Sequence, residues 1–127
     1  MTPHIESVLR KAVEKLRVAE MLVANGAWDD AVSRAYYAAF HAISALHLSQ
    51  GQTFSSHAQS IGRFNKDFVR TGMFSKEFTA ILTRLFEDRQ SGDYDVSGLV
   101  TAEDAQRDVD DARRLLEAID AYLRTAS

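Results

Sequence analysis

The stretch AVSRAYYAAFHAISA, residues 31–45, decides the fold class of this chain. Its small side chains recur at intervals of three or four, at Ala31, Ala35, Ala38, Ala42 and Ala45. Residues with this spacing lie on one face of an α-helix. A face made only of methyl groups lets a neighbouring helix approach closely. We therefore expect the helix that contains this stretch to lie at the centre of a helical bundle.

Four other segments show apolar residues at the same helical spacing. With the central segment, they predict helices over 2–24, 28–48, 56–70, 75–90 and from 101 to the end of the chain. Glycine-containing breaks separate these segments, and a short polar turn is expected over 93–98 after a break at Ser91-Gly92. Short links favour antiparallel neighbours. The sequence thus predicts an all-α, up-down bundle of four long helices plus a shorter one, as a single domain over residues 1–127.

Two of the predicted helices begin with sequence signals for capping. Ser75 is a candidate N-cap for the helix over 75–90. Thr101 and Asp104 have the spacing of a capping box, with Asp in place of the more common Glu. Apolar residues then continue along one face of the last helix. We expect its opposite face, which includes Asp108 and Asp111, to be in contact with solvent.

The composition excludes several classes of function. The chain has 127 residues and no cysteine, so disulfides and thiolate metal sites are excluded, and a reducing cytoplasm is expected. A net charge of −3 disfavours binding of duplex nucleic acid over the whole surface, but it leaves room for a pocket that engages one phosphate. No apolar run approaches the ~20 residues of a membrane span, and no signal-peptide pattern is present.

Two polar side chains fall on helix faces that otherwise carry core residues. Arg89 follows two core leucines by four and seven residues, which places it on the inner face of its helix. Because a guanidinium stays charged, it needs an acceptor or a bound anion there, or it pairs with Asp93 or extends to water. His57 lies four residues before Ile61 on the inner face of its own helix. Its imidazole titrates near neutral pH, although backbone contacts alone are an alternative role.

The central helix carries two further stripes beside its alanines. One stripe is polar and consists of Arg34, Tyr37, His41 and Ser44. It is interpreted as the wall of a groove, as a hydrogen-bonded contact between helices, or as a dimer seam. The other stripe is largely aromatic and consists of Tyr36, Phe40, Ile43 and His47. Packing in the core or at an interface explains it best, and a platform on which bases stack is the alternative. The four histidines lack metal-ligand spacing, so no metal or cofactor is predicted.

Two motifs resemble those of the HEPN family. Residues 33–41, SRAYYAAFH, are similar to the SRAYYAxFH helix of small prokaryotic HEPN proteins. Residues 89–95, RQSGDYD, match the RxxxDYD segment of the same group. The order of the remaining segments also agrees, including Ser56-His57 and the opening of the last helix, so the resemblance covers nearly the whole chain. It implies a bundle of four long helices plus a shorter one, usually assembled as a homodimer.

The resemblance also implies a chemistry. Many HEPN proteins are metal-independent ribonucleases with the signature Arg, four to six residues, then His. Arg89 matches the arginine, which holds the scissile phosphate, but Tyr94 stands where the histidine is expected. Tyrosine, with an ordinary pKa near 10, is a poor general base at pH 7, although it can donate a hydrogen bond to a phosphate. His57 or His41 would then have to replace the missing acid–base group.

Two functions follow as hypotheses. The first is a dimeric HEPN protein that binds RNA or nucleotide phosphate through Arg89 and Tyr94, with weak or no RNA cleavage. The resemblance implies that such a protein acts as a metal-independent endoribonuclease or as the toxin component of a toxin–antitoxin pair. The other site residues of this hypothesis are His57, Arg34, Tyr37, His41 and Asp93. The alternative is a non-catalytic interaction module that dimerises and partners a minimal nucleotidyltransferase, which would modify Tyr94. A bundle that has lost its ligand is a third and weaker interpretation.

Overall fold

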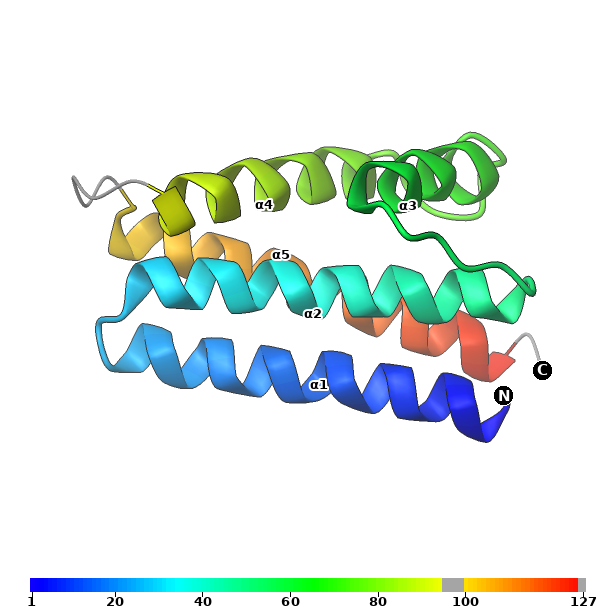
Figure 1. Cartoon of the computed structure of the whole chain (residues 1–127), viewed down its shortest axis with the longest axis horizontal. Coiled ribbons are helices and arrows are strands. Elements are labelled where there is room, and N and C mark those ends of the chain that lie inside the picture. The colour runs from blue at the N-terminus through cyan, green and yellow to red at the C-terminus, as the bar shows by residue number, and fades with distance from the viewer. Residues whose placement is uncertain (95–99, 126–127) are drawn as a thin grey trace.

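The structure is a computed structural model that describes residues 1–94 and 100–125, with only the helical backbone described over 91–94. Figure 1 shows the arrangement of its helices. The elements are α1 (Pro3–Ala24), α2 (Trp28–Ser49), α3 (His57–Phe64), the π-helical turn η1 (Asn65–Val69), α4 (Glu77–Tyr94) and α5 (Ala102–Thr125). Every regular element in the described part of the chain is helical. This confirms the prediction of an all-α bundle.

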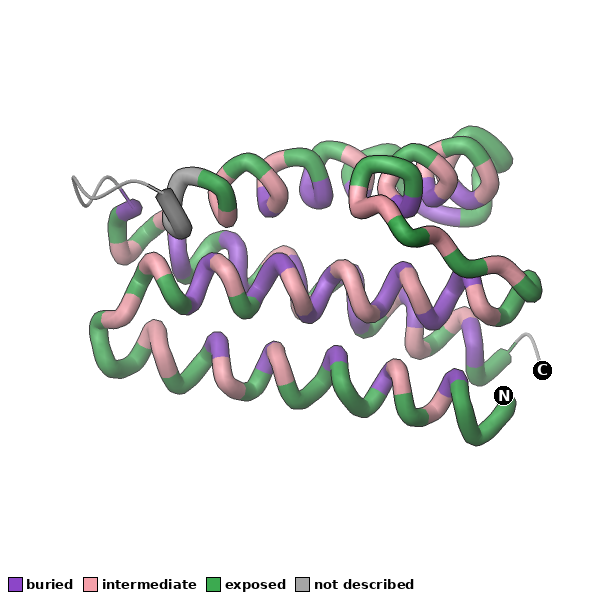
Figure 2. Tube along the Cα trace, in the orientation of Figure 1, coloured by how far each residue is buried: buried purple, intermediate pink, exposed green. Residues whose placement is uncertain are grey.

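Helix α2 lies at the centre of the bundle, as its alanines predict. It contacts α1, α3, α4 and α5, and Figure 1 shows α1 and α4 on opposite sides of it. All five alanines of its small-residue face are completely buried. The buried positions of Figure 2 follow α2 along its whole length, whereas α1 buries only one stripe. Close approach of helices to these methyl groups therefore organises the core.

Helix α4 is longer than the sequence predicts. The expected break at Ser91-Gly92 is wrong, because the helical backbone continues to Tyr94. A glycine inside a helix costs only about 1 kcal/mol relative to alanine, so it does not by itself end one. The predicted polar turn is therefore wrong at 93–94, and its remainder over 95–98 lies outside the described residues. Arg89 consequently lies within the last turns of a continuous helix and not at its frayed end.

The single helix predicted over 56–70 is divided into two parts. It begins as α3 and widens into η1, where the Arg70 N–H donates to the Asn65 carbonyl at 2.8 Å. The Asn65 side-chain oxygen accepts a hydrogen bond from the Thr79 hydroxyl of α4 at 2.9 Å. This bond ties the widened turn to the next helix. A π-helical turn leaves the apolar spacing almost unchanged, which is why the sequence pattern did not show it.

The N-terminal caps predicted for α4 and α5 are present. Thr101 and Asp104 exchange backbone-to-side-chain hydrogen bonds of 3.3 and 3.1 Å, which is a capping box. Ser75 Oγ accepts from the Glu77 N–H at 3.3 Å.

Asp108, expected at the solvent, is instead completely buried. It accepts a 3.2 Å hydrogen bond from Arg84 Nε of α4, a partner on another helix that spacing within α5 does not reveal.

Candidate functional site

Arg89 of α4 is turned toward the tyrosines of α2. Its Nη2 donates a 2.7 Å hydrogen bond to Tyr37 Oη. The guanidinium carbon lies 5.2 Å from the ring centroid of Tyr37 and 5.7 Å from that of Tyr36, within the range of a cation–π contact. Arg89 is half-buried. Its position on the inner face of α4 agrees with the sequence spacing, and its role toward a ligand stays a prediction.

His57, at the first position of α3, meets the same tyrosine pair from another side. Its Nδ1 lies 2.7 Å from Tyr36 Oη, and its ring stacks on Phe40 with centroids 4.1 Å apart. Burial strongly raises the pKa of the Tyr36 phenol, so that group keeps its proton and donates it to Nδ1. Burial first, and then the charge of Arg89, lowers the pKa of His57. His57 is therefore a neutral imidazole at pH 7 with its hydrogen on Nε2.

Hydrogen-bond donors from three helices therefore lie around the tyrosine pair, with the ring centroids of Tyr37 and His57 6.2 Å apart. We call Tyr36, Tyr37, His57 and Arg89 the tyrosine-pair site. Tyr37 Oη accepts from Arg89 and retains its own hydrogen for an acceptor. The Nε2–H of His57 has no hydrogen-bond partner among the described residues. A guanidinium, a phenol and an imidazole N–H form a donor set that suits an anion with several oxygens, such as a phosphate.

Tyr36 is the member of this site that the sequence analysis missed as a functional group. The pattern placed it in an aromatic core stripe, and the side chain is indeed completely buried. Its hydroxyl, however, fixes the orientation of His57. The available signal was the residue type itself, because a buried tyrosine needs a partner for its O–H where a phenylalanine does not.

Arg34 lies next to the site, in a pocket between α1 and α2. The pocket has a volume of about 370 Å³ and is lined by Val18, Leu22, Asp30, Ser33, Arg34 and Tyr37. Arg34 is exposed to solvent at this pocket. Tyr37 belongs both to the pocket and to the tyrosine-pair site. The polar stripe predicted on α2 therefore forms, over Arg34 and Tyr37, the wall of a groove.

The remaining predicted site residues are His41, Asp93 and Tyr94. His41 is half-buried, its ring contacts Phe40, and its pKa is lowered by burial and then by Lys11 and Lys15 of α1 and by His57. It therefore lies toward α1. Asp93 and Tyr94 follow Arg89 on α4, but their side chains lie outside the described residues. Their roles stay predictions.

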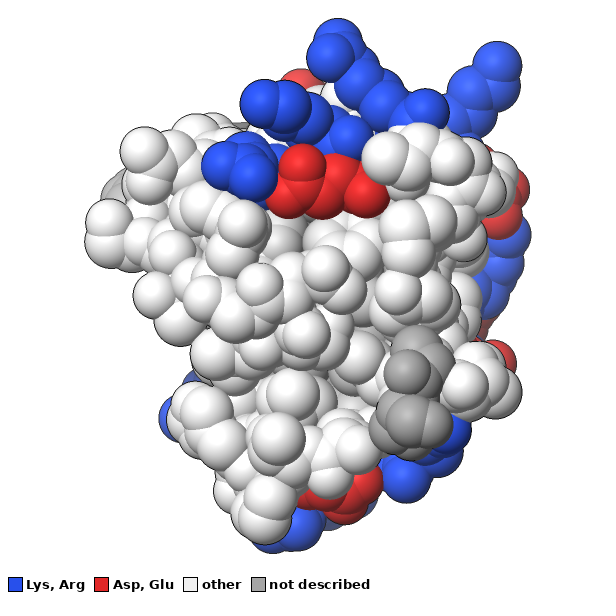
Figure 3. All heavy atoms as spheres, turned by 90° about the vertical axis from the view of Figure 1, so that its right-hand side faces the viewer, with Lys and Arg blue, Asp and Glu red and all other residues white. Residues whose placement is uncertain are grey.

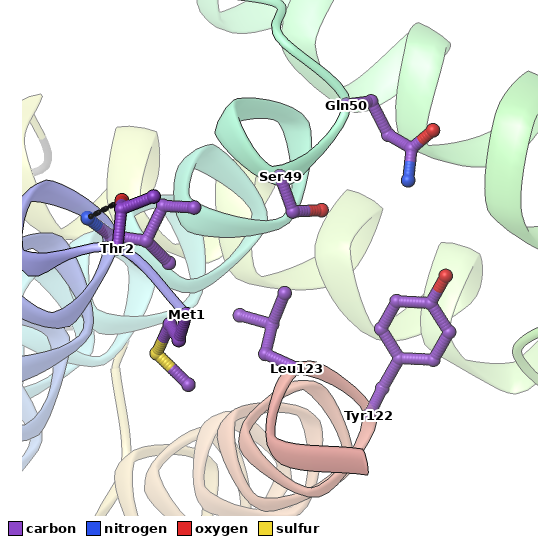
Figure 4. Close-up of a pocket in the computed structure, with 7 residues that line it drawn as sticks. Met1, Thr2, Ser49, Gln50, Tyr122 and Leu123 are labelled. Carbon is purple, nitrogen blue, oxygen red and sulfur yellow. Dashed lines mark hydrogen bonds between the residues drawn. The ribbon is translucent and has the colours of Figure 1, made fainter. Parts of the chain in front are cut away.

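Other regions of the molecule offer less chemistry. A pocket of about 420 Å³ lies at the other end of the bundle. Met1, Ser49 and Tyr122 are among the residues that line it (Figure 4). In Figure 3 the middle of that end is uncharged, and Lys and Arg side chains lie around its rim, with the largest group at the top of the view. Within the described residues, no three His, Asp or Glu side chains meet in a way that could hold a metal ion. None of the described helices is both long and apolar enough to cross a membrane.

The fold and the site together describe a class of helical bundle in which the central helix α2 carries a tyrosine pair. In this class an arginine from α4 and a histidine from α3 contact that pair. The model of the HEPN domain matches residues 5–122, and the chain belongs to the HEPN family. The chain is 43% identical over 90 residues to a UPF0332 protein of Thermotoga maritima, covering 71% of this chain and 68% of the relative.

Two other comparisons extend over nearly the whole chain. A protein of Methanocaldococcus jannaschii named "Putative toxin MJ0605" is 32% identical over 95% of this chain and 90% of its own length. The crystal structure of the protein TT1696 from Thermus thermophilus superposes with a TM-score of 0.80, covering 94% of this chain and 98% of that one. At 20% identity, the second likeness shows the shared fold alone.

Proposed function

We propose that this HEPN protein binds a phosphate group of RNA or of a nucleotide at the tyrosine-pair site, as part of a toxin-like function. The observation that carries the proposal is the 2.7 Å bond between Arg89 and Tyr37 beside the 2.7 Å bond between Tyr36 and His57. Membership of the HEPN family supports it, as do two relatives from Methanocaldococcus jannaschii whose names describe them as toxins, "Putative toxin" MJ0605 and MJ0142.

Each group at the site has a distinct part in holding the phosphate. The guanidinium of Arg89 supplies positive charge and a planar pair of N–H donors, which match two phosphate oxygens. Tyr37 holds that guanidinium in place and turns its own O–H to the ligand. His57 donates from Nε2, with its ring fixed by Tyr36 and by stacking on Phe40. The donors are in place before the ligand arrives, so little is lost in ordering them.

The same geometry favours binding over cleavage. Attack by a ribose 2′-OH requires a base with a free lone pair, and departure of the 5′ oxygen requires an acid with a proton to give. At pH 7 the neutral His57 can act as neither, since its Nδ1 lone pair is used by Tyr36 and its lowered pKa leaves it without the acidic proton of an imidazolium. Arg89 can still stabilise charge that develops at phosphorus, a contribution of about 2–4 kcal/mol when donors are preorganised. We therefore expect slow RNA cleavage at most, independent of metal ions.

A second candidate function is that of a toxin component restrained by a protein partner. The two relatives named as toxins favour it. In this version the chain forms a homodimer and binds a minimal nucleotidyltransferase, which adds nucleotides to Tyr94. Co-expression of the two proteins followed by intact mass measurement tests it. The expected result is a mass increase of one or more nucleotides that is absent in Tyr94→Phe.

The primary proposal is tested by fluorescence anisotropy with labelled single-stranded RNA in the presence of EDTA. Arg89→Ala is expected to weaken binding by about 10- to 100-fold, as for the loss of one or two charged hydrogen bonds. Arg89→Lys should recover only part, because an ammonium lacks the planar fork. The control is Arg70→Ala, an exposed arginine beyond η1. Equal affinity of wild type and Arg89→Ala would refute the proposal, provided that circular dichroism shows both are folded.

A further inference from the structure

The pocket between α1 and α2 adjoins the proposed phosphate position. One of its walls is Tyr37, whose hydroxyl is bonded to Arg89. A phosphate held by these two residues therefore lies at one end of the pocket. The nucleoside attached to that phosphate would extend into it. This inference rests on the proposed function and asks which part of the ligand the pocket recognises.

The dimensions of the pocket suit a single nucleoside. Its volume is about 370 Å³, at the lower end of the range for small-molecule sites. Asp30, Ser33, Arg34 and Tyr37 follow one another at intervals of three, one and three residues along one face of α2. Asp30 and Tyr37 are two turns apart, which is about 10 Å along the helix axis. A duplex does not fit such a space, whereas one base with its ribose does.

The walls of the pocket differ in chemistry. Val18 and Leu22 of α1 present apolar side chains, against which the flat face of a base can pack. Asp30 provides a carboxylate at the end of the pocket away from Tyr37, with two oxygens that accept hydrogen bonds. Arg34 is exposed at the pocket and can pair with a neighbouring phosphate. The apolar wall thus suits the flat face of a base, and the carboxylate suits the hydrogen-bonding edge of that base. The guanidinium suits the neighbouring phosphate of the RNA backbone.

We propose that this pocket binds the nucleobase next to the phosphate held by Arg89, and that Asp30 makes it prefer guanine. Guanine presents its N1–H and N2–H₂ donors side by side, so it can bond both oxygens of one carboxylate. Adenine and cytosine offer an amino group beside an acceptor, and uracil offers one N–H between two carbonyl oxygens. Facing carbonyl oxygens repel a carboxylate, so uracil should bind least well.

The chain contains a matched control for Asp30. Asp29 and Asp30 both lie in the first turn of α2, where the helix dipole favours negative charge. Only Asp30 lines the pocket. Asp29→Asn and Asp30→Asn therefore remove the same charge from the same helix end and carry a similar effect on stability. A difference in base preference between the two variants isolates recognition in the pocket from general electrostatics.

The experiment measures the affinities of inorganic phosphate and of the 3′-monophosphates of guanosine, adenosine, cytidine and uridine by calorimetry at pH 7.5. For wild type and Asp29→Asn we expect guanosine monophosphate to bind about tenfold more tightly than uridine monophosphate, as for one bidentate contact. In Asp30→Asn this ratio should fall to about one. Inorganic phosphate should bind both aspartate variants with the same affinity.

The outcomes separate this inference from the proposed function. If phosphate binds in an Arg89-dependent manner but wild type shows no base preference, the pocket does not read a base and only this inference fails. The same holds if Asp29→Asn loses the preference as fully as Asp30→Asn. If neither phosphate nor any nucleotide binds to folded wild-type protein, the proposed function fails and the inference fails with it. If Arg89→Ala binds all four nucleotides as tightly as wild type and keeps the base preference, the result would support the pocket and contradict the phosphate site.

Discussion

Two arginines on α4, five residues apart, have different surroundings. Arg84 faces α5, where its guanidinium pairs with Asp108 and Asp111. Arg89 faces α2, where its guanidinium bonds the hydroxyl of Tyr37 and lies over the rings of the tyrosine pair. Carboxylates match the charge of Arg84 and fix two helices together. The phenols near Arg89 offer it a hydrogen-bond acceptor and two ring faces, and Tyr37 keeps a hydrogen that can turn to a ligand. Two arginines of one helix thus meet different partners because they face different neighbours, and we expect only Arg89 to take part in binding a ligand.

Replacing each arginine by alanine should affect a different property of the protein, stability in one case and RNA binding in the other. Arg84→Ala removes the closest cation from the buried Asp108 and leaves it beside Asp88 with only a longer contact from Arg107, so we expect a loss of about 3 kcal/mol in the free energy of unfolding. Arg89→Ala should lose RNA affinity with a much smaller change in stability. Urea denaturation and RNA anisotropy on both variants measure this. Similar losses of stability in both variants would contradict the expectation that Arg84 stabilises the fold and Arg89 binds RNA.

The α4–α5 contact should also make stability depend on pH. Burial, and then Asp88, raises the pKa of Asp108 to about 7, well above its ordinary value. Between about pH 4 and pH 7 the folded chain therefore holds a proton that the unfolded chain has released. Stability from this group is present at low pH and is lost as pH rises through this window, by an amount on the order of 2–4 kcal/mol. Urea denaturation at pH 5 and pH 8 measures this change. Asp108→Asn should lack this component of the slope, and an identical slope in both proteins would contradict the assignment.

On the α2–α4 side, the phenol of Tyr37 provides a finer test. Tyr37→Phe keeps the ring beneath Arg89 and removes both the acceptor for its Nη2 and the donor for the ligand. We expect RNA affinity to fall by about 3- to 10-fold, as for one hydrogen bond. The matched control is Tyr122→Phe, which removes a phenol from the pocket at the other end of the bundle. A loss of affinity in the control equal to that in Tyr37→Phe would show that the effect is not local.

The smallest expected effect concerns His57. Because its pKa is lowered, it gains a proton only below the ordinary histidine range near 6.5. A cationic His57 adds charge at the site, so affinity for an RNA phosphodiester should rise about threefold as pH falls from 7 to 5. Anisotropy across this range checks the rise, which His57→Gln should abolish. A phosphodiester is the suitable probe because it does not titrate there. An equal rise in His57→Gln would assign the pH effect to another group.

The sequence predicted those features that depend on periodicity within one element. The alanine spacing placed α2 at the centre, and the leucine spacing turned Arg89 inward. It could not show features that arise between elements. The buried Asp108 depends on Arg84 of another helix, and the bond from Tyr36 to His57 joins residues of α2 and α3. The continuation of α4 through Gly92 was missed because a glycine weakens a helix without ending it.

The most direct test of the phosphate site is a crystal structure of the chain with a bound ribonucleoside monophosphate. We expect phosphate oxygens within hydrogen-bond distance of the Arg89 guanidinium and of Tyr37 Oη, with His57 Nε2 directed to the same group. A nucleotide bound elsewhere, with the Arg89 and Tyr37 contact unchanged, would contradict the proposal.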